Sequence, residues 1–243
     1  MEDNRTKQIN QLLNIIYRGT NPNETSMIFE VWKNSPNARE TKPIFNLFAD
    51  AFLSLHAYST LMLENCWSQA GMILRAAIEQ VSTLFVLSNY ESTISDFIRI
   101  NKLKTKYFQI ERKDEQAQFL RDNDLPTNKF EIIKFFDYGW IVSVSETVTR
   151  DDVIRLAHLD EMIDDIKDFL NPFAHGKLTI FDFAGPDGLW SFMRRYGKRA
   201  NMLCAKLFDF WCCAFKKWSN EMKVDEITSN LFVLFKKLYL ELL

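Results

Sequence analysis

The sequence has few of the residues that interrupt long helices, with only 7 glycines and 6 prolines among 243 residues. Sandwiches and barrels of many short strands need frequent turns, and this composition does not supply them. Hydrophobic residues make up 47% of the chain and charged residues 26%, a mixture that argues against disorder. The composition therefore predicts a globular protein built from long helices.

The chain also lacks an excess of charge of either sign, because 30 basic and 32 acidic residues leave a net charge of −2. This disfavours nucleic-acid binding over the whole surface and leaves only a local basic patch for that role. No uninterrupted apolar run reaches the roughly 18–20 residues that cross a bilayer. The segment Met1–Arg5 lacks the basic start and apolar stretch of a secretory signal. We therefore expect a cytoplasmic protein without a membrane partner.

Motifs of several common enzyme classes are missing as well. There is no Gly-rich phosphate loop, no nucleophile elbow and no H-E-x-x-H, which disfavours ordinary nucleotide-dependent enzymes, α/β hydrolases and zinc proteases. The four cysteines have no C-x-x-C spacing, and the adjacent pair Cys212 and Cys213 would point different ways on a helix. We predict reduced thiols packed as small hydrophobes, and no cofactor.

Apolar residues recur at helical spacing along most of the chain. The segment from Trp67 to about Ser88 is apolar on nearly every side, which is typical of the central helix of a bundle. Pro43 is expected in the first turn of the preceding helix. The predicted helices cover about 5–17, 25–33, a long segment from Pro43, 67–88, 91–110, 151–170, 189–219 and 225–243.

The predicted fold is an all-α bundle of long helices, with a short irregular or extended segment around 177–188 that includes a turn at Gly185–Gly188. We expect a single domain over 1–243, with N-terminal helices within 1–40. Residues 111–150 hold polar stretches and the breaker Leu125-Pro126, and they predict short helices and loops that form an insertion or lid.

Arg75 and Glu79 are four residues apart on the most apolar helix, so they share one of its faces. A buried charge without a partner costs several kcal/mol, so we expect the two to pair with each other or with groups on another helix. One interpretation is a structural ion pair that sets helix register. The other is a polar pocket lined by both side chains, such as a small-molecule site.

His175 follows a long predicted helix and precedes Gly176, where it can serve as a general acid and base at neutral pH. The same stretch also has a purely structural interpretation. Asn171 is a good N-cap, Pro172 a good first-turn residue and Gly176 a good C-cap. Capping does not require histidine, so both interpretations stay open.

Four basic residues at positions i, i+1, i+4 and i+5 form a basic face on the predicted helix 189–219. If the turn at Gly185–Gly188 reverses the chain, this face returns towards His175 and can bind phosphates. The alternative is a solvated charged face. The four residues are Arg194, Arg195, Lys198 and Arg199.

Asp160, Asp164 and Asp168 align on one face of a predicted helix. A di-metal helical bundle would also need Glu-x-x-His pairs, and the sequence has none, so we expect a solvent-facing ridge and no metal site. His56 lies in a helix rich in Phe and Leu and is predicted to be a core histidine.

The order of these features resembles the HEPN superfamily, small all-α proteins of prokaryotic toxin, abortive-infection and antiviral systems. The family signature is an Arg, a polar residue that is often Asn, three variable residues and a His. Asn171 and His175 match the polar residue and the His, while Leu170 stands where the Arg should be. The segment Leu74–Glu79 is also similar to a helix of HEPN-like families in which an Arg and a Glu precede a distal His.

The resemblance implies a metal-independent endoribonuclease that works as a homodimer, with RNA as substrate. His175 would move protons between the 2′-hydroxyl and the leaving 5′-oxygen, and Asn171 would orient it. Arg75, with Glu79 beside it, or the cluster from Arg194 to Arg199 would stabilise the charged phosphorane.

The departure at Leu170 supports an alternative in which nuclease activity is lost. The protein would then be a non-catalytic HEPN-like sensor, an adaptor or a ligand-binding helical protein. Its partner would be a protein of a defence or toxin–antitoxin system. Whether the protein is an enzyme therefore stays open at this point.

Overall fold

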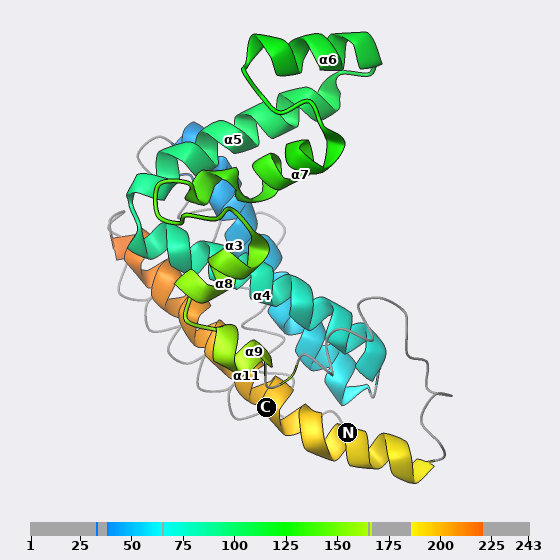
Figure 1. The fold of residues 1–243 in the computed structure, drawn as a ribbon. Coiled ribbons are helices and arrows are strands. Elements are labelled where there is room, and N and C mark those ends of the chain that lie inside the picture. The colour runs from blue at the N-terminus through cyan, green and yellow to red at the C-terminus, as the bar shows by residue number, and fades with distance from the viewer. Residues whose placement is uncertain (1–32, 34–37, 65, 165, 167–185, 221–243) are drawn as a thin grey trace, which may run out of the picture.

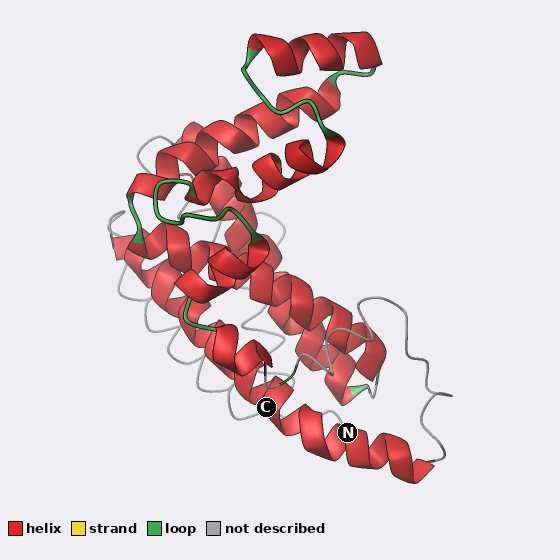
Figure 2. Ribbon diagram, in the orientation of Figure 1, coloured by secondary structure: helices red, strands yellow, loops and turns green. Residues whose placement is uncertain are grey.

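The computed structural model describes residues 33, 38–64, 66–164, 166 and 186–220. These residues form helices joined by loops, with no strand among them (Figure 2). The predicted all-α class is therefore confirmed. The helices predicted at 5–17 and 225–243 lie outside the described residues, as does the one at 25–33 apart from Lys33.

Two long helices, α3 (Ala38–Leu63) and α4 (Trp67–Asn89), pack against each other through most of their length (Figure 1). The bounds of α4 agree with the helix predicted over 67–88. Its apolar character on nearly every side follows from its position, since α3, α8 and α11 all contact it. Buried side chains of α4 include Leu74, Ile78 and Val81.

The third long helix, α11 (Pro186–Asn220), lies along α3 and α4 (Figure 1). An aromatic core fills the space between α3 and α11. The Trp211 indole Nε1 donates a hydrogen bond to the Phe48 carbonyl oxygen at 2.9 Å, and its ring stacks on Phe215 with centroids 5.2 Å apart. Phe52 contacts the same indole at 5.1 Å. This core joins α3 and α11.

The helix α5 (Ser92–Gln109) leads away from α11, and α6 (Lys113–Asp122) and α7 (Lys129–Tyr138) lie near its far end (Figure 1). The Tyr107 ring of α5 joins them, with centroids 6.3 Å from Phe119 of α6 and 5.4 Å from Phe136 of α7. A 3-10 helix, η1 (Gly139–Ile141), then packs on α5. Residues 111–150 therefore form short helices and loops, as their sequence indicates.

In the described part of the predicted helix 151–170, up to Asp164, two short helices stand in place of one. They are α8 (Arg150–Leu156) and α9 (Asp160–Asp164), and His158 between them has a left-handed backbone with φ 55°. Ala157 and Leu159 on either side of this break are fully buried. The predicted continuous helix is wrong because packing these two apolar residues outweighs helix propensity, which is a weak preference.

Two helix starts also differ from the sequence prediction. Pro43 is not in the first turn, since α3 begins five residues earlier at Ala38. The proline removes a single hydrogen bond there, the one to the carbonyl of Arg39 near the helix end. The predicted turn at Gly185–Gly188 is wrong over 186–188, because α11 begins at Pro186. Proline suits a first helical turn.

One helix among the described residues, over Gln69–Asn89 in α4, is long and apolar enough to cross a membrane by length and composition. In the bundle, 56% of that stretch is buried against other helices. The core helix of a soluble bundle has the same length and composition, so this property does not by itself indicate a membrane protein.

Candidate functional site

Arg75 and Glu79 lie on the face of α4 that contacts α8. The Arg75 Nε is 3.9 Å from the Glu79 Oε1, as the spacing of the two residues indicates. The same oxygen lies 2.5 Å from the Nε of Arg150, the first residue of α8. Glu79 therefore joins two guanidinium groups from different helices, and we call Arg75, Glu79, Arg150 and the neighbouring Tyr138 the Arg75 cluster.

The start of α8 positions Arg150. Thr149 is the N-cap, and its hydroxyl accepts a hydrogen bond from the Asp152 backbone N–H while the Asp152 carboxylate accepts one from the Thr149 N–H. This reciprocal pair is a capping box, which defines where the helix begins and the direction in which its first residue points. Arg150 is thereby held opposite Glu79 of α4.

The Arg75 cluster is open to solvent on one side. The exposed side-chain fractions are 26% for Arg75, 25% for Arg150 and 39% for Glu79. Its two guanidiniums outnumber its one carboxylate, while Asp137 and Asp151 lie close enough to act on its tyrosine. Guanidinium groups bind phosphate and carboxylate oxygens in a bidentate way, so the cluster can accept an anion from solvent.

Tyr138 adds a neutral hydroxyl beside these charges. Burial, and then the negative charges of Glu79 and Asp137, raise the pKa of Tyr138 to about 12. Its phenol is therefore protonated at neutral pH and can donate a hydrogen bond, but it cannot act as a general base.

We expect Glu79→Gln to lower the free energy of unfolding by about 1–2 kcal/mol, a value between those of exposed and buried ion pairs. The loss arises because Arg75 and Arg150 then face each other without the carboxylate between them. Urea denaturation measures the effect. The control is Glu115→Gln, whose 3.3 Å pair with Arg112 is well exposed and whose loss should cost under about 0.5 kcal/mol. Equal effects for the two variants would contradict the prediction.

The structure places only some of the other predicted site residues. His175 and Asn171 lie outside the described residues. Arg194 and Arg195 belong to α11, but their side chains are also outside that set. Lys198 and Arg199 are exposed on α11, and the turn expected to bring this basic face back towards His175 is helical over 186–188.

The two described histidines have different surroundings. His56 on α3 is half-buried, and burial lowers the pKa of its imidazole, so it is neutral at physiological pH. His158 is exposed in the break between α8 and α9, with its ring edge-to-face with Phe85 at 6.3 Å. Neither histidine belongs to the Arg75 cluster.

The thiols and the acidic ridge do not form a metal site in the described part of the chain. All four cysteines are free of disulfides. Cys204 is buried, as expected of a thiol packed as a small hydrophobe, but the prediction is wrong for Cys213, which is exposed because it points away from the core on α11. Asp160 and Asp164 are exposed on α9, as expected, while Asp168 is outside the described residues. No group of three His, Cys, Asp or Glu side chains able to hold a metal ion occurs among the residues described.

Arg150 and Tyr138 were not predicted as site residues from the sequence. Both lie more than 50 residues from Glu79 along the chain, so no short motif connects them to it. The only local signal was the cap motif at Thr149 and Asp152, which indicates a helix start and hence the first-turn position of Arg150.

Comparison with protein-family models, with curated proteins and with solved structures finds no match to this chain. The resemblance to the HEPN superfamily therefore remains a prediction from Asn171, His175 and the segment Leu74–Glu79.

Proposed function

We propose that the protein is a HEPN-like member of a prokaryotic defence or toxin-type system and cleaves RNA without a metal ion. The observation that carries the proposal is the convergence of Arg75 and Arg150 on Glu79 at a partly exposed position. Leu170 stands in place of the arginine of the family signature. The Arg75 cluster supplies the cationic groups that the signature lacks.

In the proposed reaction, the RNA 2′-oxygen forms a bond to phosphorus and the bond from phosphorus to the 5′-oxygen breaks. His175 accepts the proton of the 2′-hydroxyl, and its imidazolium form delivers a proton to the leaving 5′-oxygen. Arg75 and Arg150 stabilise the negative charge of the phosphorane, and Asn171 orients the imidazole or the phosphate. A homodimer would bring two such motifs to one cleft.

Incubation of total RNA with the purified protein in EDTA tests the proposal. We expect the wild type to cut RNA and His175→Ala to show no cutting above a protein-free control. His158→Asn is the matched control, because His158 is exposed and asparagine tolerates its positive φ of 55°. Cutting by the His175 variant, or its absence in the wild type, would contradict the nuclease proposal.

Arginine variants test the contribution of the cluster separately from that of the histidine. We expect Arg75→Ala to lower the rate of cutting by about 100-fold, as for the loss of one group that stabilises developing charge. Arg121→Ala is the control, since Arg121 is exposed on α6 and bonds only to Gln118 among the described residues. Melting temperatures of both variants exclude unfolding as the cause of the loss.

A non-catalytic HEPN-like sensor, adaptor or ligand-binding protein is the second candidate. It is favoured by Glu79, whose carboxylate already pairs with Arg150 at 2.5 Å, an arrangement that suits a structural link between α4 and α8. This candidate predicts ligand binding without turnover. A thermal-shift screen of anionic ligands in which a shift disappears in Arg75→Ala would support it.

A further inference from the structure

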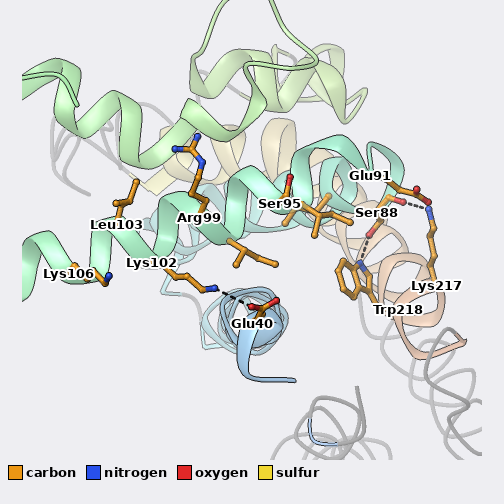
Figure 3. A pocket seen from close by; sticks show the side chains of 13 residues that line it. Glu40, Ser88, Glu91, Ser95, Arg99, Lys102, Leu103, Lys106, Lys217 and Trp218 are labelled. Atoms are coloured by element: carbon orange, nitrogen blue, oxygen red, sulfur yellow. Dashed lines mark hydrogen bonds and ion pairs between the residues drawn. The ribbon is translucent and has the colours of Figure 1, made fainter. Parts of the chain in front are cut away.

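An elongated groove of about 680 Å³ lies away from the Arg75 cluster, between α5, the N-terminal part of α3 and the C-terminal part of α11 (Figure 3). Its floor is aliphatic and includes Leu87, Ile94, Ile98 and Leu103. The part of α5 that lines it extends to Lys106, about 20 Å of helix at 1.5 Å per residue. A groove of this length accommodates about four turns of a helix.

Cations border this floor. Arg99, Lys102 and Lys106 follow one another along α5, with Lys102 and Lys106 on the side towards Glu40 and Arg99 pointing the other way (Figure 3). Lys217 of α11 lies at the other end of the groove, where it donates a hydrogen bond to the Ser88 carbonyl oxygen. Lys102 and Lys106 are four residues apart, so they share one face of α5 over about 6 Å.

Most of these cations form only weak ion pairs within the protein, so they remain able to bind a new anionic partner. Lys102 is 3.7 Å from Glu40 with both side chains more than half exposed, and Arg99 pairs with Asp96 of its own helix at 3.0 Å. Lys106 has no carboxylate partner in the described part of the chain. Exposed pairs of this kind contribute about 0–1 kcal/mol, so an incoming carboxylate can displace them.

The side chains of the groove floor distinguish between two possible anionic ligands, single-stranded RNA and an acidic helix. Single-stranded RNA binds cationic grooves by stacking its bases on aromatic rings. The one aromatic ring lining the described groove is Trp218, which is only 8% exposed and whose Nε1 donates a hydrogen bond to the Ser88 Oγ at 3.2 Å. An aliphatic floor instead matches the apolar face of an amphipathic helix.

We infer that this groove binds an acidic amphipathic helix of a partner protein. Apolar side chains of that helix at positions i, i+3, i+4 and i+7 pack on Ile94, Ile98 and Leu103. Its Asp and Glu side chains lie beside Lys102 and Lys106, on the side of the groove towards Glu40. The inference goes beyond the proposed function, because it assigns a protein partner to a surface separate from the Arg75 cluster.

Selection from a library of random 16-residue peptides displayed on phage tests this inference on the full chain. Selection on the wild type is followed by removal of phage that also bind Lys102→Glu/Lys106→Glu. We expect the surviving peptides to share apolar residues at helical spacing and an excess of Asp and Glu. Failure to enrich any sequence, or enrichment without acidic residues, would overturn the inference.

A synthetic peptide of the consensus sequence then gives the size of the effect by fluorescence anisotropy. We expect at least 10-fold weaker binding to Lys102→Glu/Lys106→Glu. The control Lys113→Glu/Lys129→Glu changes net charge equally at exposed residues outside the groove and should alter affinity less than 2-fold. Equal losses of affinity for the two variants would show that binding depends on the overall charge of the protein and not on the groove. Displacement of the peptide by a 12-nucleotide single-stranded RNA would assign the groove to RNA instead.

Discussion

Replacing Trp211 by alanine is expected to lower the free energy of unfolding by about 3–5 kcal/mol, the range for removing a large aromatic side chain from a core. Trp211 is 0% exposed, and its ring lies within 5.2 Å of both Phe52 and Phe215. Alanine leaves a cavity among these rings and also leaves the Phe48 carbonyl without the indole donor. Because Phe48 and Phe52 belong to α3, the substitution weakens the contact between α3 and α11.

Urea denaturation followed by circular dichroism measures this effect. Trp211→Phe provides a milder variant that keeps an aromatic ring but loses the hydrogen bond to Phe48, and we expect a loss of about 1–2 kcal/mol. The matched control is Met202→Ala on the same helix, where the side chain is 57% exposed, and its effect should stay within about 0.5 kcal/mol. Similar losses for Met202→Ala and Trp211→Ala would show that this core does not hold α11 to α3.

Asp152→Asn is expected to lower the free energy of unfolding by about 2–3 kcal/mol at pH 7, because hydrogen bonds to a buried charged group are among the stronger ones. The Asp152 side chain is 1% exposed. Its carboxylate accepts hydrogen bonds from the hydroxyls of Thr147 at 2.8 Å and Thr149 at 2.6 Å, and it pairs with Arg155. An amide in its place has no negative charge for Arg155 and puts a donor where the Thr149 N–H also donates, so the start of α8 is weakened.

The same carboxylate gives this stability difference a pH dependence. Burial alone would raise the pKa of Asp152, but the hydrogen bonds from Thr149 and Thr147 and the charge of Arg155 outweigh burial and lower it. Because the pKa of Asp152 is lower in the folded state, the contribution of its carboxylate to stability is complete above the pKa of an unfolded Asp, about 3.9. This contribution is lost as the pH falls through the pKa of the folded state. The difference between wild type and Asp152→Asn should therefore be equal at pH 7 and pH 5 and should shrink below about pH 4.

Urea denaturation at pH 7, 5, 4 and 3 tests this expectation. Asp151→Asn serves as the control, since Asp151 is the exposed neighbour of Asp152 on the same helix. A difference between Asp152→Asn and wild type that widens on acidification would contradict the lowered pKa.

The prediction of long helices succeeded where burial is one-sided or complete over many turns. The helix α4 was predicted to within one residue at its end, because a long run of apolar residues without proline offers no alternative to a buried helix. The prediction of α5 over 91–110 also agrees closely with the observed Ser92–Gln109. In both helices the local pattern and the tertiary environment favour the same structure.

The prediction was wrong where a few contacts outweigh local preference. The break at His158 allows Ala157 and Leu159 to be buried. The spacing of residues in the sequence does not predict a break in the helix at this point. Pro43 lies inside α3 because one missing hydrogen bond near a helix end costs less than ending the helix there. In both places the competing conformations differ by a small free energy, and contacts with residues distant in the sequence decide between them.

The order of residues by itself determined the all-α class, the core position of α4 and the pairing of Arg75 with Glu79, because each follows from spacing along a single helix. Only the tertiary structure brought Arg150 and Tyr138 to that pair and placed Lys217 of α11 in the same groove as the cations of α5. Residues of one helix have relative positions given by its geometry, whereas the approach of α8 to α4 and of α11 to α5 depends on how many apolar side chains pack at the same time.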